Sequence, residues 1–356
     1  MGIFSFGKRS DLFGVDIGTS SIKVAQLAGS REAGFTLTRY SILEAHGQID
    51  RANSALQANG LKLLDKEIVS YLKLIKEKAG ITATRATASI PTFAGFTTLL
   101  ELPVTSDKEI NQTINYQAKN YIPLPITTVT LDWLKVGERE APDGTKRQQV
   151  FLISIPNETI EHYTNIFNQA GFILDSLEIE NVSVARILSA ASKTPKLIVD
   201  LGGRSTSMTV AKEGELKFAG QTDYASGSLT QTLAQALNIH PRRAEDLKRA
   251  THLAAVGGEQ ELSTIMLPII DAILSEVERV RVNFEKSYGE KIDQIILNGA
   301  GANLSGLVEY VSSSLSLPTV LSPLSNYIKF PPEVDAIKEE LGPTLSVAVG
   351  LALKNI

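Results

Sequence analysis

Two segments of the chain share one pattern, and this repeat limits the possible folds more than any other feature. The first reads GVDIGTSSIKV at residues 14–24, and the second reads IVDLGGRSTSMTV at residues 198–210. In each, an apolar run ends in Asp, a glycine with small or hydroxyl residues follows, and a second apolar run begins. This is typical of two strands joined by a tight turn. Two copies in a chain of 356 residues predict two related domains that face one site.

The residue types in both turns suit phosphate binding. Glycine lets the backbone approach a ligand closely, and converging backbone N–H groups form an anion-binding nest. Two aspartates beside such a nest, Asp16 and Asp200, suit Mg²⁺ held through water between carboxylate and phosphate. The remaining candidates are Gly18, Thr19, Ser20, Ser21, Lys23, Gly202, Gly203, Ser205 and Thr206. A single turn of this kind is more commonly an ordinary hairpin, so the prediction depends on the second copy.

A third glycine-rich segment follows an apolar strand near the C-terminus and reads IILNGAGANLSGL at residues 295–307. Gly299 and Gly301 would let a base or ribose lie against bare backbone. Such turns are common in α/β folds, so this one is informative only as the third after two phosphate-type turns.

Composition excludes several functional classes. The net charge of -4 argues against nucleic-acid binding, and the absence of Cys excludes disulfides and thiolate metal sites. No apolar run reaches the ~18 residues of a membrane span, and the N-terminus does not resemble a secretory signal. We therefore expect a cytoplasmic protein.

The segment between the two turns predicts an inserted α+β module. Its expected order is strand, helix, strand, strand, helix, strand over residues 84–179, which is the split βαβ pattern. The predicted boundaries are residues 1–85, 173–195 and 340–356 for the first domain, 86–172 for the inserted module, and 196–339 for the second domain.

The three glycine motifs, in this order, resemble those of the actin-like ATPase superfamily, which includes actin, Hsp70, sugar kinases and FtsA. The resemblance implies an α/β, actin-like (ribonuclease H-like) fold of two domains with an FtsA-type inserted subdomain, and binding of ATP with Mg²⁺. By this resemblance Asp16 and Asp200 hold the Mg²⁺ waters. The first phosphate turn is Gly18, Thr19, Ser20 and Lys23, the second is Gly202, Gly203 and Arg204, and the adenosine turn is Gly299 and Gly301. Ala300 departs from the pattern, since many members have a second glycine there.

Two further segments carry site residues by resemblance. The helix PRRAEDLKR at 241–249 is similar to the one that lines the ribose and adenine in FtsA-like members, with Glu245 and Lys248 as contacts. A solvated amphipathic helix is the alternative. Glu180 stands where the superfamily keeps an acidic or amide residue near the attacking water, although an acid at a helix N-terminus is also favoured by the helix dipole. Hydrolysis stays open, with at most slow ATPase activity expected.

A closer resemblance is to the PilM family of type IV pilus assembly proteins. It is carried by SIPTFAGFTTLLELP at 89–103, YIPLP at 121–125, SLEIENVSVARIL at 176–188 and SVAVGLALK at 346–354. The resemblance implies a cytoplasmic scaffold at the inner face of the inner membrane that binds the N-terminal tail of PilN in a nucleotide-linked manner. Contacts with pilus assembly ATPases and self-association are also implied, with membrane contact only through partners.

The tail is expected in a groove between the first domain and the inserted module. The candidate groove residues are Ile90, Phe93, Phe96, Tyr121 and Ile122, each of which could instead be a core residue.

Two other functions remain open. An FtsA-like, filament-forming membrane tether of cell division would need an amphipathic C-terminal helix, whereas this chain ends at Ile356 directly after an apolar segment. A small-molecule kinase would need a catalytic base and a polar substrate pocket, and no second carboxylate motif is evident.

Overall fold

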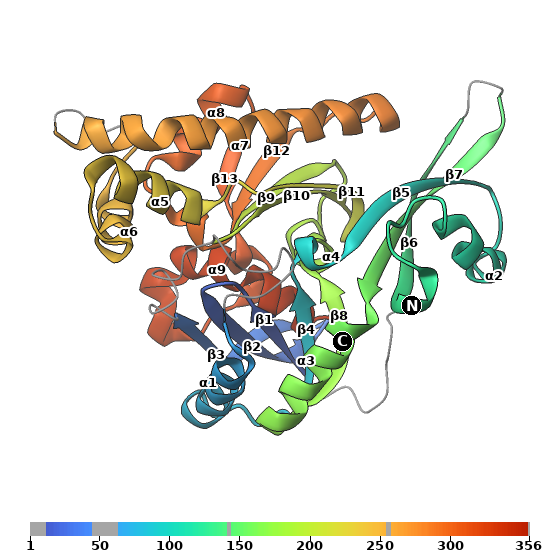
Figure 1. The fold of residues 1–356 in the computed structure, drawn as a ribbon, viewed down its shortest axis with the longest axis horizontal. Coiled ribbons are helices and arrows are strands. Elements are labelled where there is room, and N and C mark those ends of the chain that lie inside the picture. The colour runs from blue at the N-terminus through green and yellow to red at the C-terminus, as the bar shows by residue number, and fades with distance from the viewer. Residues whose placement is uncertain (1–11, 45–62, 141–143, 254–257, 355–356) are drawn as a thin grey trace.

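A computed structural model describes residues 12–44, 63–140, 144–253 and 258–354. Three sheets organise these residues (Figure 1). Two of them carry the repeated hairpins, and the third forms a module beside them. No helix in these ranges has both the length and the apolar composition needed to cross a membrane.

The first sheet has the strand order β14-β3-β2-β1-β4-β8. Its strands are β1 (Leu12–Ile17), β2 (Ser21–Ser30), β3 (Gly34–Glu44), β4 (Arg85–Ile90), β8 (Ile173–Ile179) and β14 (Ile328–Lys329). β1 and β2 form an antiparallel hairpin, while β1, β4 and β8 run parallel.

The second sheet repeats this arrangement. Its order is β11-β10-β9-β12-β13, built from β9 (Lys196–Leu201), β10 (Thr206–Lys212), β11 (Glu215–Thr222), β12 (Gln294–Asn298) and β13 (Thr319–Leu321). β9 and β10 pair antiparallel, and β12 runs parallel to β9, as β4 does to β1. The predicted repeat of the sequence is therefore a repeat of topology.

Helices cover both sheets. α1 (Asp65–Lys78) and α3 (Asn157–Ala170) pack on the first sheet through apolar side chains such as Leu72 and Phe167, which surround Phe13. The second sheet carries α5 (Ser226–Leu237), α6 (Pro241–Ala250), α7 (Gly258–Tyr288) and α8 (Leu307–Leu315).

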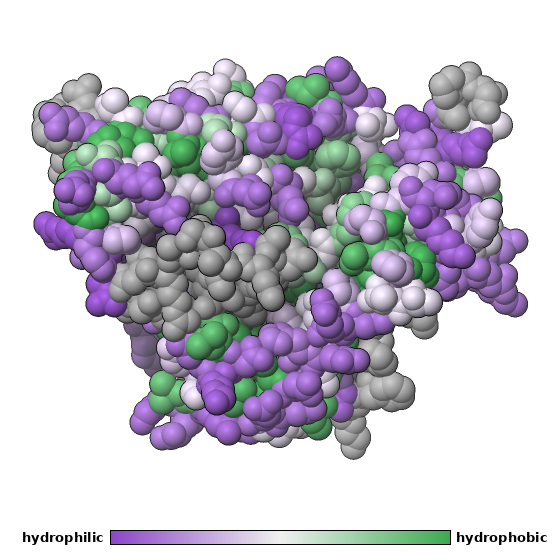
Figure 2. Space-filling model, in the orientation of Figure 1, coloured by the Kyte–Doolittle hydropathy of each residue, from purple (hydrophilic) through white to green (hydrophobic). Residues whose placement is uncertain are grey.

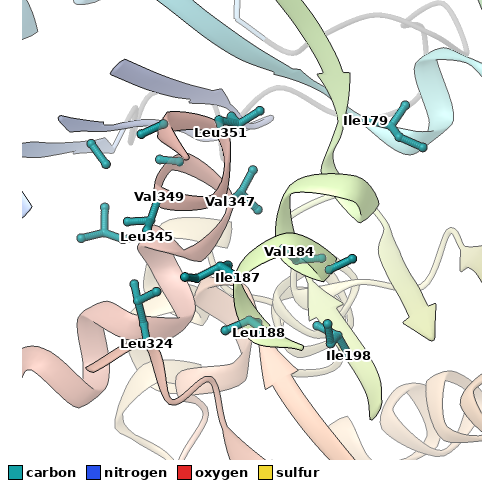
Figure 3. Packing of buried hydrophobic residues seen from close by; sticks show 14 of the residues in the cluster. Ile179, Val184, Ile187, Leu188, Ile198, Leu324, Leu345, Val347, Val349 and Leu351 are labelled. Carbon is teal, nitrogen blue, oxygen red and sulfur yellow. The ribbon is translucent and has the colours of Figure 1, made fainter. Parts of the chain in front are cut away.

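Two helices lie between the sheets and join them. α4 (Glu180–Leu188) and α9 (Lys338–Ala352) share one apolar cluster with Ile198 of β9 and Ile296 of β12. Figure 3 shows this packing, with Ile187 of α4 pointing toward α9. α9 approaches β1 so closely that a Cβ on Gly14 would lie 1.8 Å from the Ala348 carbonyl oxygen, so only glycine fits there. The two domains thus meet through a shared core.

The inserted module is a three-stranded sheet with the order β5-β7-β6 and one helix. It comprises β5 (Phe96–Pro103), α2 (Asp107–Ala118), β6 (Val129–Glu140) and β7 (Lys146–Pro156). α2 covers one face with Ile110 and Ile114, and the opposite face joins the cluster around α4 and α9. Figure 2 shows a mostly hydrophilic surface with several hydrophobic groups of side chains, one of which lies at the position of this module.

Two of the predicted assignments are wrong. α3 and β8 do not complete a split βαβ unit in the module, because the buried face of α3 packs on Phe13 and its neighbours while β8 pairs with β4 of the first sheet. The second domain also ends earlier than residue 339. β14 pairs with β3, so the chain has already returned to the first sheet.

Candidate functional site

A cavity of about 440 Å³ lies where the two hairpin turns meet. Every residue predicted to contact nucleotide or to act on it lines this one cavity, apart from Thr206, which was named only as an added hydroxyl. These residues are Asp16, Gly18, Thr19, Ser20, Ser21, Lys23, Glu180, Asp200, Gly202, Gly203, Arg204, Ser205, Glu245, Lys248, Gly299, Ala300 and Gly301. The structure brings together segments that are far apart in the sequence, while their individual roles remain predictions.

The first turn is closed by its own backbone, because the Gly18 N–H donates to the Ser21 carbonyl at 2.9 Å. Asp16 and Lys23 stand opposite each other in the β1–β2 register, so both side chains leave the same face of the hairpin. Lys23 Nζ donates to Asp16 Oδ2 at 3.0 Å, and Ser89 Oγ donates to Asp16 Oδ1 at 2.8 Å. The carboxylate is thereby fixed at the end of β1.

The second turn has the same closure, from the Gly202 N–H to the Ser205 carbonyl at 3.1 Å. It lies directly against the first turn. A Cβ built on Gly203 would be 3.0 Å from Thr19 Oγ1 and 3.3 Å from Ser20 Oγ. Both turns therefore border one narrow space lined by backbone and hydroxyl groups.

Three acids and one lysine in this space shift one another's pKa values. Burial raises the pKa of Glu180, and the charges of Asp16 and Asp200 raise it further, against the attraction of Lys23. Burial also raises the pKa of Asp200 to about 6, although Asn298 donates to its carboxylate. Burial opposes the charge of Lys23, but Asp16 prevails and the pKa of that amine rises. The excess of carboxylates would be relieved by a bound cation.

The third turn completes the wall beside Asp200. Gly299 has φ +82°, and a Cβ there would lie 2.6 Å from the Leu201 carbonyl oxygen and 2.7 Å from Asp200 Oδ1. Glycine is required because the backbone of this turn touches the end of β9. Ala300 and Gly301 continue the lining, with Ala300 exposed.

Helix α6 also lines the cavity, and the side chain that it contributes there is an ion-paired lysine, Lys248, rather than a solvated one. Lys248 is buried, and its Nζ lies 2.7 Å from Glu245 Oε2 while donating to Ser226 Oγ at 2.8 Å and Thr230 Oγ1 at 3.0 Å. Burial opposes ionisation of Glu245, but Lys248, Thr230 and Arg249 hold its pKa at about 2. Burial outweighs the ion pair for Lys248, whose pKa is lowered.

Several lining residues were missed by sequence reasoning. Gly227, at the start of α5, would carry a Cβ only 2.3 Å from the Gly203 carbonyl oxygen. The run Ala225-Ser226-Gly227-Ser228 is a helix-start signal that could have directed attention to it. Arg249 joins Glu245 at 2.9 Å to Glu44 of β3 at 3.2 Å, and so links the two domains at the mouth of the cavity. A surface pair of this kind has no signal in the sequence.

The five predicted groove residues do not share one cavity. Phe93 lines the cavity described above, where the Arg204 guanidinium lies 4.4 Å from its ring centroid. Phe96 and Ile122 pack against the core of the inserted module, and Tyr121 is half-exposed. Only Ile90 lines a second cavity.

This second cavity, of about 330 Å³, is the apolar groove between the first sheet and the inserted module. Its walls come from β8, α3 and α4 on one side and from β6 and β7 on the other. The lining residues are Ile90, Asp132, Leu134, Ile153, Ile155, Ile160, Thr164, Leu174, Asp175, Ser176, Leu177, Glu178, Ile179, Val182, Arg186 and Lys354.

Two sheets of repeated topology that meet at a cavity between their hairpin turns define the actin-like class of proteins, as predicted. Solved structures with this fold include ethanolamine utilization protein EutJ from Carboxydothermus hydrogenoformans (TM-score 0.55, 18% identity, 96% of this chain and 88% of that one). MreB5 of Spiroplasma citri bound to ADP also matches (TM-score 0.53, 12% identity, 93% and 94%).

A model of the family described as type IV pilus assembly protein PilM matches residues 14–356, and the chain therefore belongs to that family. A solved structure entitled "PilM-PilN type IV pilus biogenesis complex" matches with a TM-score of 0.82 and 18% identity, over 98% of this chain and 99% of that one. The predicted fold class and family are confirmed.

Proposed function

We propose that this chain binds ATP with Mg²⁺ between its two hairpin turns and, as a scaffold of the type IV pilus assembly platform, holds the N-terminal tail of PilN in a nucleotide-linked manner. The observation that carries the proposal is the close approach of the two turns, with Gly203 against Thr19 and Ser20. Relatives of the same fold include a protein bound to ADP and a PilM-PilN complex, which supports both parts.

The residues present fit a metal-bound triphosphate. The turns offer backbone N–H groups and hydroxyls, and Lys23 offers a cation. Within the described residues, no group of three or more His, Cys, Asp or Glu side chains could ligate an ion. As the resemblance to the actin-like superfamily implies, Asp16 and Asp200 would act through water, with phosphate oxygens as the direct ligands. Bound Mg²⁺ would neutralise phosphate charge.

The adenosine is assigned to the opposite end of the cavity. Gly299, Ala300 and Gly301 would provide the surface for the base, and α6 would provide Glu245 and Lys248 near the ribose. The cavity volume is in the range of small-molecule sites.

Hydrolysis would be slow at most. Glu180 lines the cavity at the start of α4 and would be the residue that orients a water molecule. Burial and two neighbouring carboxylates raise its pKa well above the ordinary value, and a bound cation would lower that pKa again.

The PilN tail is assigned to the apolar groove between the first sheet and the inserted module. This groove lies between the first sheet and the inserted module, which is the position expected for the tail. Of the five predicted groove residues, only Ile90 lines it. Contacts with assembly ATPases, self-association, and a cytoplasmic location at the inner membrane through partners are further proposals that rest on family membership.

One helix connects the two sites. α4 begins with Glu180 in the nucleotide cavity and places Val182 and Arg186 in the groove. Its Asn181 accepts from Thr92 Oγ1 at 2.6 Å and donates to Thr209 Oγ1 of β10 at 2.7 Å. A nucleotide that draws the second domain closer would displace α4, and partner affinity changes only if the tail distinguishes the two positions.

Calorimetric titration with Mg²⁺-ATP tests the nucleotide site. We expect Asp16→Ala to abolish the Mg²⁺-dependent part of the affinity, while Asp107→Ala, an exposed aspartate of α2, leaves it unchanged. Equal affinity of the two variants would overturn the site assignment. If the protein binds the PilN tail with equal affinity in the presence and absence of nucleotide, the proposed coupling of the two sites is wrong, while the assignment of the nucleotide site stands.

A further inference from the structure

Arg204 is the charged side chain of the second turn, and it contacts a ring from another part of the molecule. It lines the nucleotide cavity, and its guanidinium lies 4.4 Å from the ring centroid of Phe93. Phe93 belongs to the short helix η3 (Thr92–Ala94), which connects β4 of the first sheet to β5 of the inserted module. A cation–π contact therefore joins the second domain to the segment that enters the module.

The segment around Phe93 is held by neighbours from two other elements. Thr92 Oγ1 donates to Asn181 Oδ1 of α4 at 2.6 Å. A Cβ built on Gly95 would lie 3.0 Å from the Ser154 carbonyl oxygen, so the backbone after η3 lies directly against β7 of the module. A change in the position of Phe93 would consequently be felt by both α4 and the module.

The contact lies at the end of the cavity where the terminal phosphate of ATP is expected. Glu180 is the residue assigned to the attacking water, which must stand next to that phosphate. The next residue, Asn181, is the one bonded to Thr92, and Phe93 follows Thr92 in the chain. Glu180, Phe93 and Arg204 all line the same cavity. The adenosine is assigned to the other end.

We propose that Arg204 distinguishes ATP from ADP by moving between two partners, the ring of Phe93 and the terminal phosphate. The inference rests on the proposed function and adds to it the residue that detects the terminal phosphate. With ADP the guanidinium stays on the ring. With ATP it binds the phosphate and releases Phe93, and the segment that enters the module is then free to move with α4.

The relative strength of the two contacts supports this exchange. Both Arg204 and Phe93 are half-buried, so water reaches the pair and the cation–π contact is of the weaker kind. A phosphate offers charged oxygens to the planar fork of a guanidinium, and hydrogen bonds of this charge-assisted type are stronger. A terminal phosphate within reach therefore displaces the ring.

Nucleotide affinities of Arg204→Gln test the contact with the phosphate. In calorimetric titrations we expect Mg²⁺-ATP to bind about tenfold more weakly and Mg²⁺-ADP to change by less than about twofold. The matched control is Arg31→Gln, an exposed arginine between β2 and β3 that lines neither cavity. Equal losses for the two nucleotides, or no loss, overturn the inference while the proposed function stands. Failure of the wild-type protein to bind Mg²⁺-ATP overturns both.

The ring is tested by Phe93→Leu, which keeps an apolar side chain. Because the cation–π contact no longer has to be broken, Mg²⁺-ATP should bind up to about fivefold more tightly, with Mg²⁺-ADP unchanged. In the background of Arg204→Gln, the same substitution should bring no gain. A ring that merely supports the second turn would instead weaken both nucleotides when removed. Unchanged or weaker ATP binding by Phe93→Leu therefore contradicts the exchange.

A fluorine label reports on the ring directly. With 4-fluorophenylalanine at position 93, Arg204→Gln without nucleotide gives the ¹⁹F resonance of a ring that has lost the guanidinium. Mg²⁺ with a non-hydrolysable ATP analogue should shift the resonance of the otherwise wild-type protein toward that position, and Mg²⁺-ADP should not. A resonance that the analogue leaves unmoved, or that ADP moves equally, shows that Arg204 does not leave the ring in response to the terminal phosphate.

Discussion

Replacing either of the two adjacent glycines of the second turn, Gly202 or Gly203, by alanine should have opposite effects on stability and on ligand binding. At Gly203 the added methyl would meet only hydroxyl ends, Thr19 Oγ1 at 3.0 Å and Ser20 Oγ at 3.3 Å, which can rotate away. At Gly202 it would lie 2.8 Å from the Ser205 carbonyl oxygen, which is fixed backbone of the same turn. Gly203→Ala should therefore fold normally and obstruct the ligand, whereas Gly202→Ala should disturb the turn itself.

The magnitudes follow from what each methyl displaces. For Gly203→Ala we expect the free energy of unfolding to change by no more than about 0.5 kcal/mol, as for an exposed substitution without backbone strain. The methyl enters the space assigned to phosphates and would remove one charge-assisted hydrogen bond, worth about 1.5–3 kcal/mol, which corresponds to about 10- to 100-fold in Kd. For Gly202→Ala we expect a destabilisation of about 1–3 kcal/mol from the overpacked turn.

Two measurements on each variant separate these effects. Urea unfolding without ligand gives stability, and calorimetric titration with Mg²⁺-ATP gives Kd. The expected result is a stable Gly203→Ala with weak nucleotide binding beside an unstable Gly202→Ala. If Gly203→Ala binds Mg²⁺-ATP as tightly as wild type, the phosphates do not lie between the turns and the reasoning is refuted.

Two further predictions concern the connections between parts of the molecule. Phe93→Leu removes the ring under Arg204, a contact worth about 1 kcal/mol. The ratio of PilN-tail affinities with and without ATP should then fall up to about fivefold, with Phe96→Leu as control and an unchanged ratio as the contrary result. Glu245→Gln should lower stability at neutral pH by up to about 3 kcal/mol, because the folded pKa of Glu245 is about 2 against 4.5 in the unfolded chain. That stabilisation is present above pH 4.5 and is lost as pH falls toward 2, so urea unfolding curves of wild type and variant should converge in acid. A constant difference would show that ionisation of Glu245 is not its source.

The sequence was sufficient for the fold class because the informative pattern is local and occurs twice. A strand ending in Asp and a glycine turn specify a hairpin by short-range chemistry, and both copies form the predicted turn. The third turn could be predicted for the same reason.

What could not be predicted depends on contacts between distant segments. Helical periodicity identifies α3 but does not say which sheet its apolar face covers, and Phe167 turned out to pack beside Phe13. The five predicted groove residues do not share one cavity for a similar reason, since Phe96 and Ile122 are as apolar as the residues that line the second cavity but pack in the core of the module. The pairing of Arg249 with Glu44 joins two exposed charges whose meeting depends on how the domains are placed.

A crystal structure of the protein with Mg²⁺ and a non-hydrolysable ATP analogue is the most direct test of the account. We expect the phosphates between the turns at Gly18–Ser20 and Gly202–Ser205, with the metal on the side of Asp16 and Asp200. Electron density for the nucleotide at any other place, or none at millimolar concentrations of the analogue, would contradict it.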